Sequence, residues 1–213
     1  MITVHGRKTS SNVQALLWGL EEMGLSYERI DRGGRFGGLD APDFRALNPH
    51  GRIPTVVIDG RALWETAAIL RYFAGQHGAA AFWPTDPMAR AQVDMWAEWA
   101  KNEVSANFTR PVFWEAVRVP EERRDYAALQ AAIDVFEAQL AKADAVLQGQ
   151  DFLTGAQFTL ADVMLGHVLW RYFDIEITRR DMPALRAYAE RLATRPAYQK
   201  TVMVSYDILR NTL

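Results

Sequence analysis

The sequence predicts a small α/β domain followed by a larger all-helical (all-α) domain. Strand-like and helix-like patterns alternate as far as about residue 78, and a segment rich in Gly and Ala interrupts them between Gly75 and Pro87. The remaining chain carries apolar residues at helical spacing. We therefore place the first domain at residues 1–78, a linker at 79–87 and the second domain at 88–213. A chain of 213 residues is long enough for two modest domains.

The first half begins with a strand–helix–strand pattern. Ile2–Val4 is predicted as a short strand, and the polar segment Gly6–Asn12 as the turn after it. Val13–Met23 then carries apolar residues on one helical face and ends before Gly24, which favours a helix C-terminus. Leu25–Asp31 is predicted as the second strand. Because a helix crosses over between the two strands, they should pair in parallel.

The rest of the first half predicts a glycine-punctuated loop at Gly33–Gly38, then a hairpin and a helix. Val56–Ile58 favours a strand because its residues are β-branched. Asp59-Gly60 is a typical type I′ turn pair, and Ala62–Trp64 returns as the partner strand. Thr66 stands where the N-cap of the following helix is expected. The order βαβ, loop, ββα indicates a thioredoxin-like domain.

The second half contains several helix signals. Asp86 and Pro87 have the pattern of an N-cap followed by proline at the first helical position. Thr159 and Asp162 have the spacing of a capping box, with Asp in place of the usual Glu, and Pro183 begins a further helix. One long helical face is formed by Leu129, Ile133, Phe136, Leu140, Ala143 and Leu147.

Composition excludes several classes of function. The formal net charge is −2 without a long basic run, which argues against a nucleic-acid partner. No apolar run is long enough to cross a membrane, and Met1–Arg7 does not resemble a signal peptide, so we expect a cytoplasmic protein. The chain has no cysteine, and its four histidines lack metal-ligand spacing, so we expect neither a disulfide nor a metal site.

A carboxylate and a hydroxyl stand side by side where the helix after the hairpin begins. The first N–H groups of a helix lack intrahelical partners and attract anions, while Glu65 can bind a cation. Glu65 and Thr66 therefore suit a zwitterion such as the head group of an α-amino acid, with its ammonium on Glu65 and its carboxylate at the helix N-terminus. A capped helix with a solvated Glu is the alternative.

Three motifs in register resemble those of the cytosolic glutathione transferases. They are Asn-Pro-His-Gly-Arg-Ile-Pro at 48–54, Glu-Thr at 65–66 and Phe-Thr-Leu-Ala-Asp at 158–162, and their order and spacing match along essentially the whole chain. The segment Gly-Arg-Lys-Thr-Ser-Ser-Asn-Val-Gln at 6–14 is similar to bacterial serine-type (theta- or nu-like) members. The resemblance implies a homodimeric transferase, with a role in detoxification, that uses glutathione as co-substrate against small hydrophobic electrophiles.

The resemblance also implies which residues bind glutathione. Pro54 matches the family's cis-proline, and Ile53 should offer its backbone N–H and C=O to the cysteinyl part. Glu65 and Thr66 match the pair that holds the γ-glutamyl head, in agreement with the zwitterion interpretation. Arg52 matches an often basic position near the glycyl end, for which a solvated surface arginine is the alternative.

The residue that ionises the thiol should lie in the turn before the first helix. A hydroxyl that donates to sulfur at a helix N-terminus favours the thiolate. Counting back from Gly24 aligns Ser10 with the active hydroxyl of serine-type members and Asn12 with a supporting side chain. We expect Ser11 or Asn12 to cap the helix while Ser10 faces the sulfur, and the choice among these three as the sulfur contact stays open.

The electrophile pocket is expected between the two domains, along the first long helix of the second one. We place Phe108 and Arg110 in this pocket. The same stretch carries Trp96, Trp99 and Trp114, which form either an aromatic wall for flat apolar substrates or part of the core and dimer packing.

Glutathione transfer has two alternative functions. A glutathione-dependent disulfide reductase or peroxidase would bind two glutathiones at Ser10 and Asn12. A non-catalytic transferase-like interaction module would share only the fold, and the presence of Glu65, Thr66 and a turn hydroxyl argues against it.

Overall fold

The computed structural model describes residues 1–77 and 79–213. Its first part contains a four-stranded sheet in the order β2-β1-β3-β4. The strands are β1 (Ile2–His5), β2 (Tyr27–Ile30), β3 (Thr55–Ile58) and β4 (Arg61–Trp64). β1 pairs in parallel with β2 and antiparallel with β3, which confirms the pairing predicted from the crossover helix. The hairpin turn between β3 and β4 has positive φ at Asp59 (48°) and Gly60 (77°), as a type I′ turn requires.

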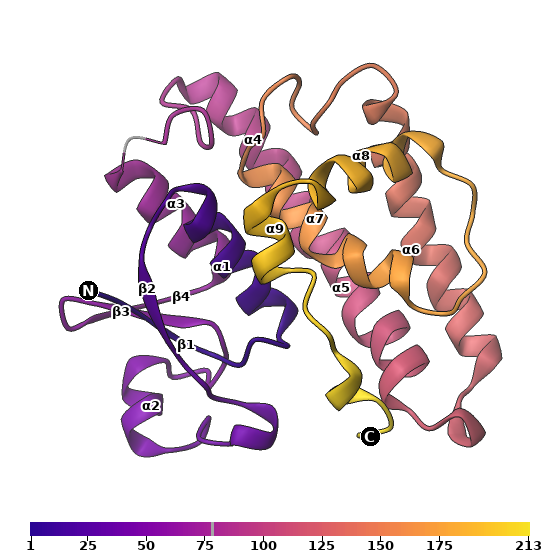
Figure 1. The fold of residues 1–213 in the computed structure, drawn as a ribbon, viewed down its shortest axis with the longest axis horizontal. Helices are drawn as coiled ribbons and strands as arrows, with labels where there is room; N and C mark the ends of the chain where they lie inside the picture. The colour runs from indigo at the N-terminus through magenta and orange to yellow at the C-terminus, as the bar shows by residue number, and fades with distance from the viewer. Residues whose placement is uncertain (78) are drawn as a thin grey trace.

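Three helices belong to this part of the chain. α1 (Ser11–Glu22) and α3 (Thr66–Gln76) lie on one side of the sheet, and α2 (Pro42–Leu47) lies on the other (Figure 1). α1 ends before Gly24, whose φ of 68° fits the predicted helix stop. The sequence did not predict α2, because Phe44 is its one buried residue and a single apolar side chain produces no helical periodicity.

The second part is helical, as predicted. Its elements are α4 (Pro87–Trp99), a π-helical segment (Ala100–Ser105), α5 (Ala106–Phe108), a second π-helical segment (Thr109–Arg118), α6 (Tyr126–Leu147), α7 (Leu160–Asp174), α8 (Pro183–Ala193) and α9 (Pro196–Thr201). Short 3₁₀ turns occur at Gly34–Phe36, Glu121–Arg123 and Asp207–Leu209. Gly78, at the predicted domain boundary and within the segment Gly75–Pro87, lies outside the described residues.

The helix signals of the second half are confirmed. The Asp86 carboxylate accepts a hydrogen bond from the N–H of Ala89 at 2.9 Å. The Asp162 carboxylate accepts from the N–H of Thr159 at 2.8 Å and completes the predicted capping box. All six residues of the predicted face of α6 are buried.

The two parts meet where α1 packs against α7 and α9. Trp18 of α1 is completely buried there. Its ring passes so close to Gly166 of α7 that a Cβ at this glycine would lie 2.9 Å from it, so only glycine fits. Glu22 and Arg195 add a bidentate ion pair with N–O distances of 2.7 and 2.6 Å. The second domain therefore holds the helix whose N-terminus carries the predicted catalytic turn.

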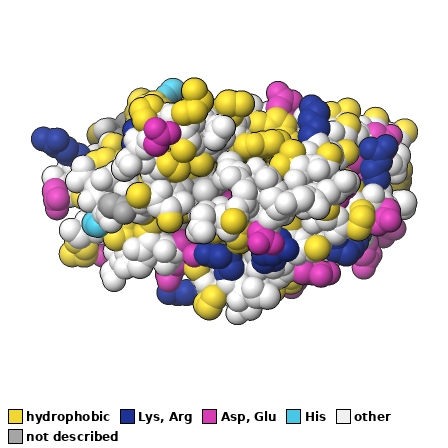
Figure 2. All heavy atoms as spheres, turned by 90° about the horizontal axis from the view of Figure 1, so that it is seen from above, with side chains coloured by type: hydrophobic (Ala, Val, Ile, Leu, Met, Phe, Trp, Pro, Cys, Tyr) yellow, Lys and Arg dark blue, Asp and Glu magenta, His cyan; other side chains and the backbone are white. Residues whose placement is uncertain are grey.

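The surface is of mixed character. On the face shown in Figure 2, Lys and Arg side chains lie among Asp, Glu and hydrophobic side chains. Within residues 1–77 and 79–213, no helix combines the length and hydropathy needed to span a membrane.

His167 of α7 predicts a pH dependence of folding stability. Burial lowers its pKa from 6.5 to about 3, whereas the unfolded chain binds this proton near the ordinary pKa. The unfolded state therefore holds more protons below pH 6.5, and stability should be lost as the pH falls from 6.5 toward 3. This one group should cost about 2 kcal/mol of unfolding free energy between pH 7 and pH 5.

Urea unfolding of His167→Gln at both pH values measures this contribution. The variant should lose part of the acid destabilisation, whereas His77→Gln, at an exposed histidine, should behave like the wild type. Equal pH dependence of His167→Gln and wild type would show that His167 does not titrate as described.

Candidate active site

Two neighbouring cavities open at the N-terminal ends of α1 and α3. The smaller, which we call the Glu65 cavity, has a volume of about 120 Å³. It is lined by Asn12, Asn48, His50, Arg52, Ile53, Pro54, Trp64, Glu65, Thr66 and Lys101. The larger, which we call the Ser10 cavity, has a volume of about 590 Å³. It is lined by Arg7, Thr9, Ser10, Ser11, Asn12, Leu39, Gly51, Arg52, Ile53, Thr109, Arg110, Phe113, Trp114, Arg118, Arg171 and Leu209.

Glu65 has an unusual backbone conformation at the entrance of α3. Its φ of 70° and ψ of 117° are sparsely populated by residues other than glycine, and such strain is common at functional sites. Glu65 is the N-cap residue, and Thr66 is the first helical residue, so the predicted N-cap was wrong by one position. The buried Thr66 hydroxyl donates to the backbone C=O of Asn12 at 3.4 Å, which ties α3 to α1.

The loop before β3 is held by a buried amide side chain. Asn48 donates from Nδ2 to the C=O of Arg52 and to Oγ1 of Thr55, both at 3.0 Å, and accepts from the N–H of His50 at 3.0 Å. The peptide bond between Ile53 and Pro54 is cis, as the resemblance implied. In the part of the chain that the structure describes, the N–H and C=O of Ile53 make no backbone hydrogen bond. An extended peptide can therefore pair with this residue.

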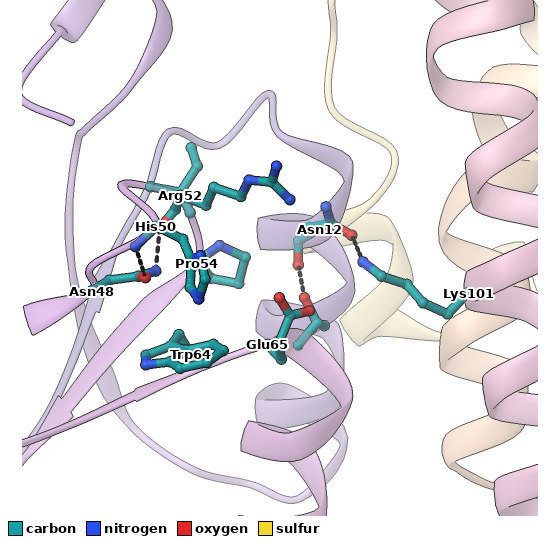
Figure 3. Close-up of a pocket in the computed structure, with 10 residues that line it drawn as sticks. Asn12, Asn48, His50, Arg52, Pro54, Trp64, Glu65 and Lys101 are labelled. Atoms are coloured by element: carbon teal, nitrogen blue, oxygen red, sulfur yellow. Dashed lines mark hydrogen bonds between the residues drawn. The ribbon is translucent and has the colours of Figure 1, made fainter. Parts of the chain in front are cut away.

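Sequence reasoning did not identify Lys101 or His50 as site residues. Lys101 Nζ donates to Oδ1 of Asn12 at 3.0 Å, and Figure 3 shows it reaching from the second domain toward the space that Arg52 and Glu65 also face. Burial lowers the pKa of Lys101, while the carboxylates of Glu65 and Glu98 oppose this shift. His50 lies edge-on to Trp64 at 4.9 Å. Lys101 lies in a π-helical segment, where α-helical spacing does not predict which side chains face a site.

Ser10 has a hydroxyl that is not used for capping. It occupies the N-cap position of α1 with extended backbone geometry, yet among the described residues no side-chain hydrogen bond caps this helix. The expectation that Ser11 or Asn12 caps it was therefore wrong, and the Asn12 side chain pairs with Lys101 instead. Ser10 is half-buried and lines the larger cavity beside the free N–H groups of α1.

The turn that carries Ser10 is anchored from the second domain. Arg171 of α7 is 3% exposed and donates from a terminal nitrogen to the C=O of Thr9 at 2.8 Å. Its guanidinium lies over the ring of Phe113 at 4.6 Å. Arg171 therefore acts as a positioning residue for the turn, and no sequence signal linked it to residues more than 160 positions earlier.

Of the two residues predicted for the electrophile pocket, Arg110 lines the Ser10 cavity and Phe108 does not. Arg110 and Trp114 line the Ser10 cavity. Phe108 is 1% exposed and packs in the core against the rings of Phe136, at 4.9 Å, and Phe113, at 6.0 Å. Trp96 and Trp99 contact each other at 5.0 Å and belong to neither cavity lining, which favours their packing interpretation.

Comparison with known proteins decides the family. A family model described as "Glutathione S-transferase, N-terminal domain" matches residues 9–76, and one described as "Glutathione S-transferase, C-terminal domain" matches residues 121–191. Glutathione S-transferase GstB of Escherichia coli K12 is 36% identical over 206 residues, which covers 96% of this chain and 99% of that protein. The chain belongs to the glutathione S-transferase family.

Further relatives of this glutathione transferase agree with its fold and architecture. Glutathione S-transferase 3 of Zea mays is 31% identical, with 94% of this chain and 93% of that protein covered. A crystal structure of a theta-class glutathione S-transferase from Xanthomonas axonopodis pv. citri, with glutathione bound, has a TM-score of 0.91. It is 43% identical and covers 96% of this chain and 98% of its own. The resemblance seen in the sequence, the thioredoxin-like first domain and the helical second domain are thereby confirmed.

Proposed function

We propose that this glutathione transferase binds glutathione across both cavities and presents its thiolate to an electrophile in the Ser10 cavity. One observation carries the proposal: Asn12, Arg52 and Ile53 line both cavities, so a single extended tripeptide can place its γ-glutamyl head on Glu65 and the thiol of its central cysteinyl residue beside Ser10. The γ-glutamyl ammonium would lie on Glu65, its carboxylate at the N-terminus of α3, and the cysteinyl backbone on Ile53.

The chemistry that follows is thiolate formation and nucleophilic attack. A free thiol has a pKa of about 8.5, so little thiolate exists at neutral pH. The Ser10 hydroxyl donates to sulfur, and the N-terminal end of α1 adds positive potential, so both favour loss of the thiol proton to solvent. Sulfur then forms a bond to the electrophilic carbon, whose leaving group departs with the bonding electron pair. The protein supplies orientation and anion stabilisation.

Glutathione binding should depend strongly on Glu65 and Thr66. Glu65→Gln removes the charge that holds the ammonium, and Thr66→Ala removes the hydroxyl that would turn from the C=O of Asn12 to donate to the carboxylate. Hydrogen bonds to charged groups contribute about 1.5–3 kcal/mol, so each change should weaken binding roughly tenfold. Calorimetric titration of glutathione measures this, with Glu28→Gln, at an exposed carboxylate of β2, as the matched control. Wild-type affinity in both variants would refute the placement of the head group.

Among the described residues, no feature favours disulfide reduction or non-catalytic binding over glutathione transfer. We further propose that residues 79–87 link the two domains and that the protein is cytoplasmic. We also propose a homodimer on family grounds. The exposed apolar side chains of Tyr72 on α3 and of Met88 and Met95 on α4 support it. Sedimentation velocity tests the assembly, and a monomer at assay concentrations would contradict it.

A further inference from the structure

The Ser10 cavity has an unusual concentration of positive charge. Five arginines line it, namely Arg7, Arg52, Arg110, Arg118 and Arg171, and no Asp or Glu is among its described lining residues. The chain as a whole carries a formal net charge of −2, so this cluster is a local property. It also differs from the face in Figure 2, where acidic and basic side chains are intermingled.

No carboxylate of the described chain pairs with these five arginines. None takes part in an ion pair within residues 1–77 and 79–213. Arg118 donates from Nε to the Thr212 hydroxyl at 3.1 Å, and Arg171 donates to a backbone carbonyl, so both of these partners are neutral. Nε of Arg7 and Nε of Arg171 are buried without any hydrogen-bond partner in the described chain. Buried charged groups are normally paired, so the buried Arg171 and the half-buried Arg7 and Arg118 lack a counter-ion in the described chain.

Aromatic rings support three of the guanidinium groups. The Cζ atoms of Arg110 and Arg118 lie 4.6 Å and 4.5 Å from the centroid of the Trp114 ring. The guanidinium of Arg171 lies over the ring of Phe113. Stacking of this kind uses the faces of the guanidinium groups and leaves their N–H edges free to donate. The cavity therefore combines an aromatic surface with several cationic donors that no carboxylate of the described chain engages.

Arginines of this cluster that lie near one another also repel each other. Burial, and then the charge of Arg118, lowers the pKa of Arg7. Burial, and then Arg110, lowers the pKa of Arg118. Burial is the main cause that lowers the pKa of Arg171 to about 10, with Arg7 adding to the shift and Tyr206 opposing it. All remain protonated at neutral pH, so a bound anion would relieve this repulsion.

We propose that the Ser10 cavity selects electrophiles that carry a carboxylate or a similar anionic group attached to an aromatic body. The anionic group binds the N–H edges of Arg110 and Arg118, and the ring of the substrate packs beside Trp114 and Phe113. This inference rests on the proposed glutathione transfer and replaces a purely hydrophobic substrate class with aromatic acids. The competing explanation is that these arginines serve only the carboxylates of glutathione itself.

A pair of glutathione conjugates separates the two explanations. S-(4-carboxybenzyl)glutathione and S-(4-carbamoylbenzyl)glutathione have the same tripeptide and nearly the same shape, and they differ in one negative charge. In calorimetric titrations the carboxylate conjugate should bind about tenfold tighter, because it adds charge-assisted hydrogen bonds. Equal affinities would overturn the proposed selectivity while glutathione binding stands. If neither conjugate binds, the proposed function itself fails.

Variants of the cavity test which arginines carry the preference. Arg110→Gln and Arg118→Gln should each reduce the affinity ratio of the two conjugates to about threefold or less, and Arg110→Lys should keep more of it. Arg61→Gln, at an exposed arginine of β4, should leave the ratio as in the wild type. Binding of the carboxamide conjugate shows that each variant is folded. An unchanged ratio in both Gln variants would overturn the assignment to these arginines.

Discussion

Ser10→Ala should lower kcat/KM of this glutathione transferase about 10- to 100-fold and raise the pKa of the bound glutathione thiol. The reason is that a hydrogen bond to a charged acceptor contributes about 1.5–3 kcal/mol, and we propose that Ser10 makes this one to the thiolate and not to the thiol. Ser10 is well placed for it, because its hydroxyl lines the larger cavity and caps no helix. Titration of the thiolate absorbance in the ultraviolet, with glutathione bound, measures the pKa directly.

Three companion variants make the Ser10 experiment specific. Ser10→Thr keeps a hydroxyl and should retain most of the activity. Ser11→Ala and Asn12→Ala test the two neighbours, and Asn12→Ala also removes the partner of Lys101. If the thiol titrates normally in Ser10→Ala and abnormally in Ser11→Ala, then Ser11 is the sulfur contact. If all three alanine variants titrate like the wild type, the N–H groups of α1 stabilise the thiolate alone.

Asp162→Ala should destabilise the fold by about 3–5 kcal/mol. The carboxylate is completely buried and accepts hydrogen bonds from the N–H of Leu153 at 2.9 Å, the Tyr188 hydroxyl at 2.9 Å, and the N–H and hydroxyl of Thr159 at 2.8 and 3.1 Å. Burial raises the pKa of Asp162, and these four hydrogen bonds oppose that shift. Truncation to alanine leaves the donors without a partner at the start of α7, a type of change with a large cost.

Urea unfolding measures the effect of Asp162→Ala. The matched control is Asp134→Ala on the exposed face of α6, which should change the unfolding free energy by no more than about 0.5 kcal/mol. Because α7 also carries Arg171, the anchor of the Ser10 turn, activity should fall together with stability in the Asp162 variant. Similar midpoints for the two variants would mean that the capping network contributes little.

Local sequence signals predicted the regular elements well where a residue type has one strong conformational preference. The Asp59-Gly60 pair has the two positive φ angles of its turn, Gly24 ends α1, and Thr159 and Asp162 form the capping box. Prediction was poorer where the signal was weak or shifted. α2 has a single buried residue, and the cap of α3 is displaced to Glu65, whose positive φ no local preference indicates.

The chain alone was enough to propose where the glutathione head binds, because Glu65 and Thr66 are neighbours at one helix entrance and the loop Asn48–Pro54 is contiguous. The charge of the Ser10 cavity, where we propose that the electrophile binds, required the tertiary structure. Arg7, Arg52, Arg110 and Arg171 come from distant segments and meet only because α1 docks on α7. Packing removes water from the buried Arg171 and the half-buried Arg7 without bringing a carboxylate of the described chain to them. That condition depends on three-dimensional contacts which no spacing along the chain encodes.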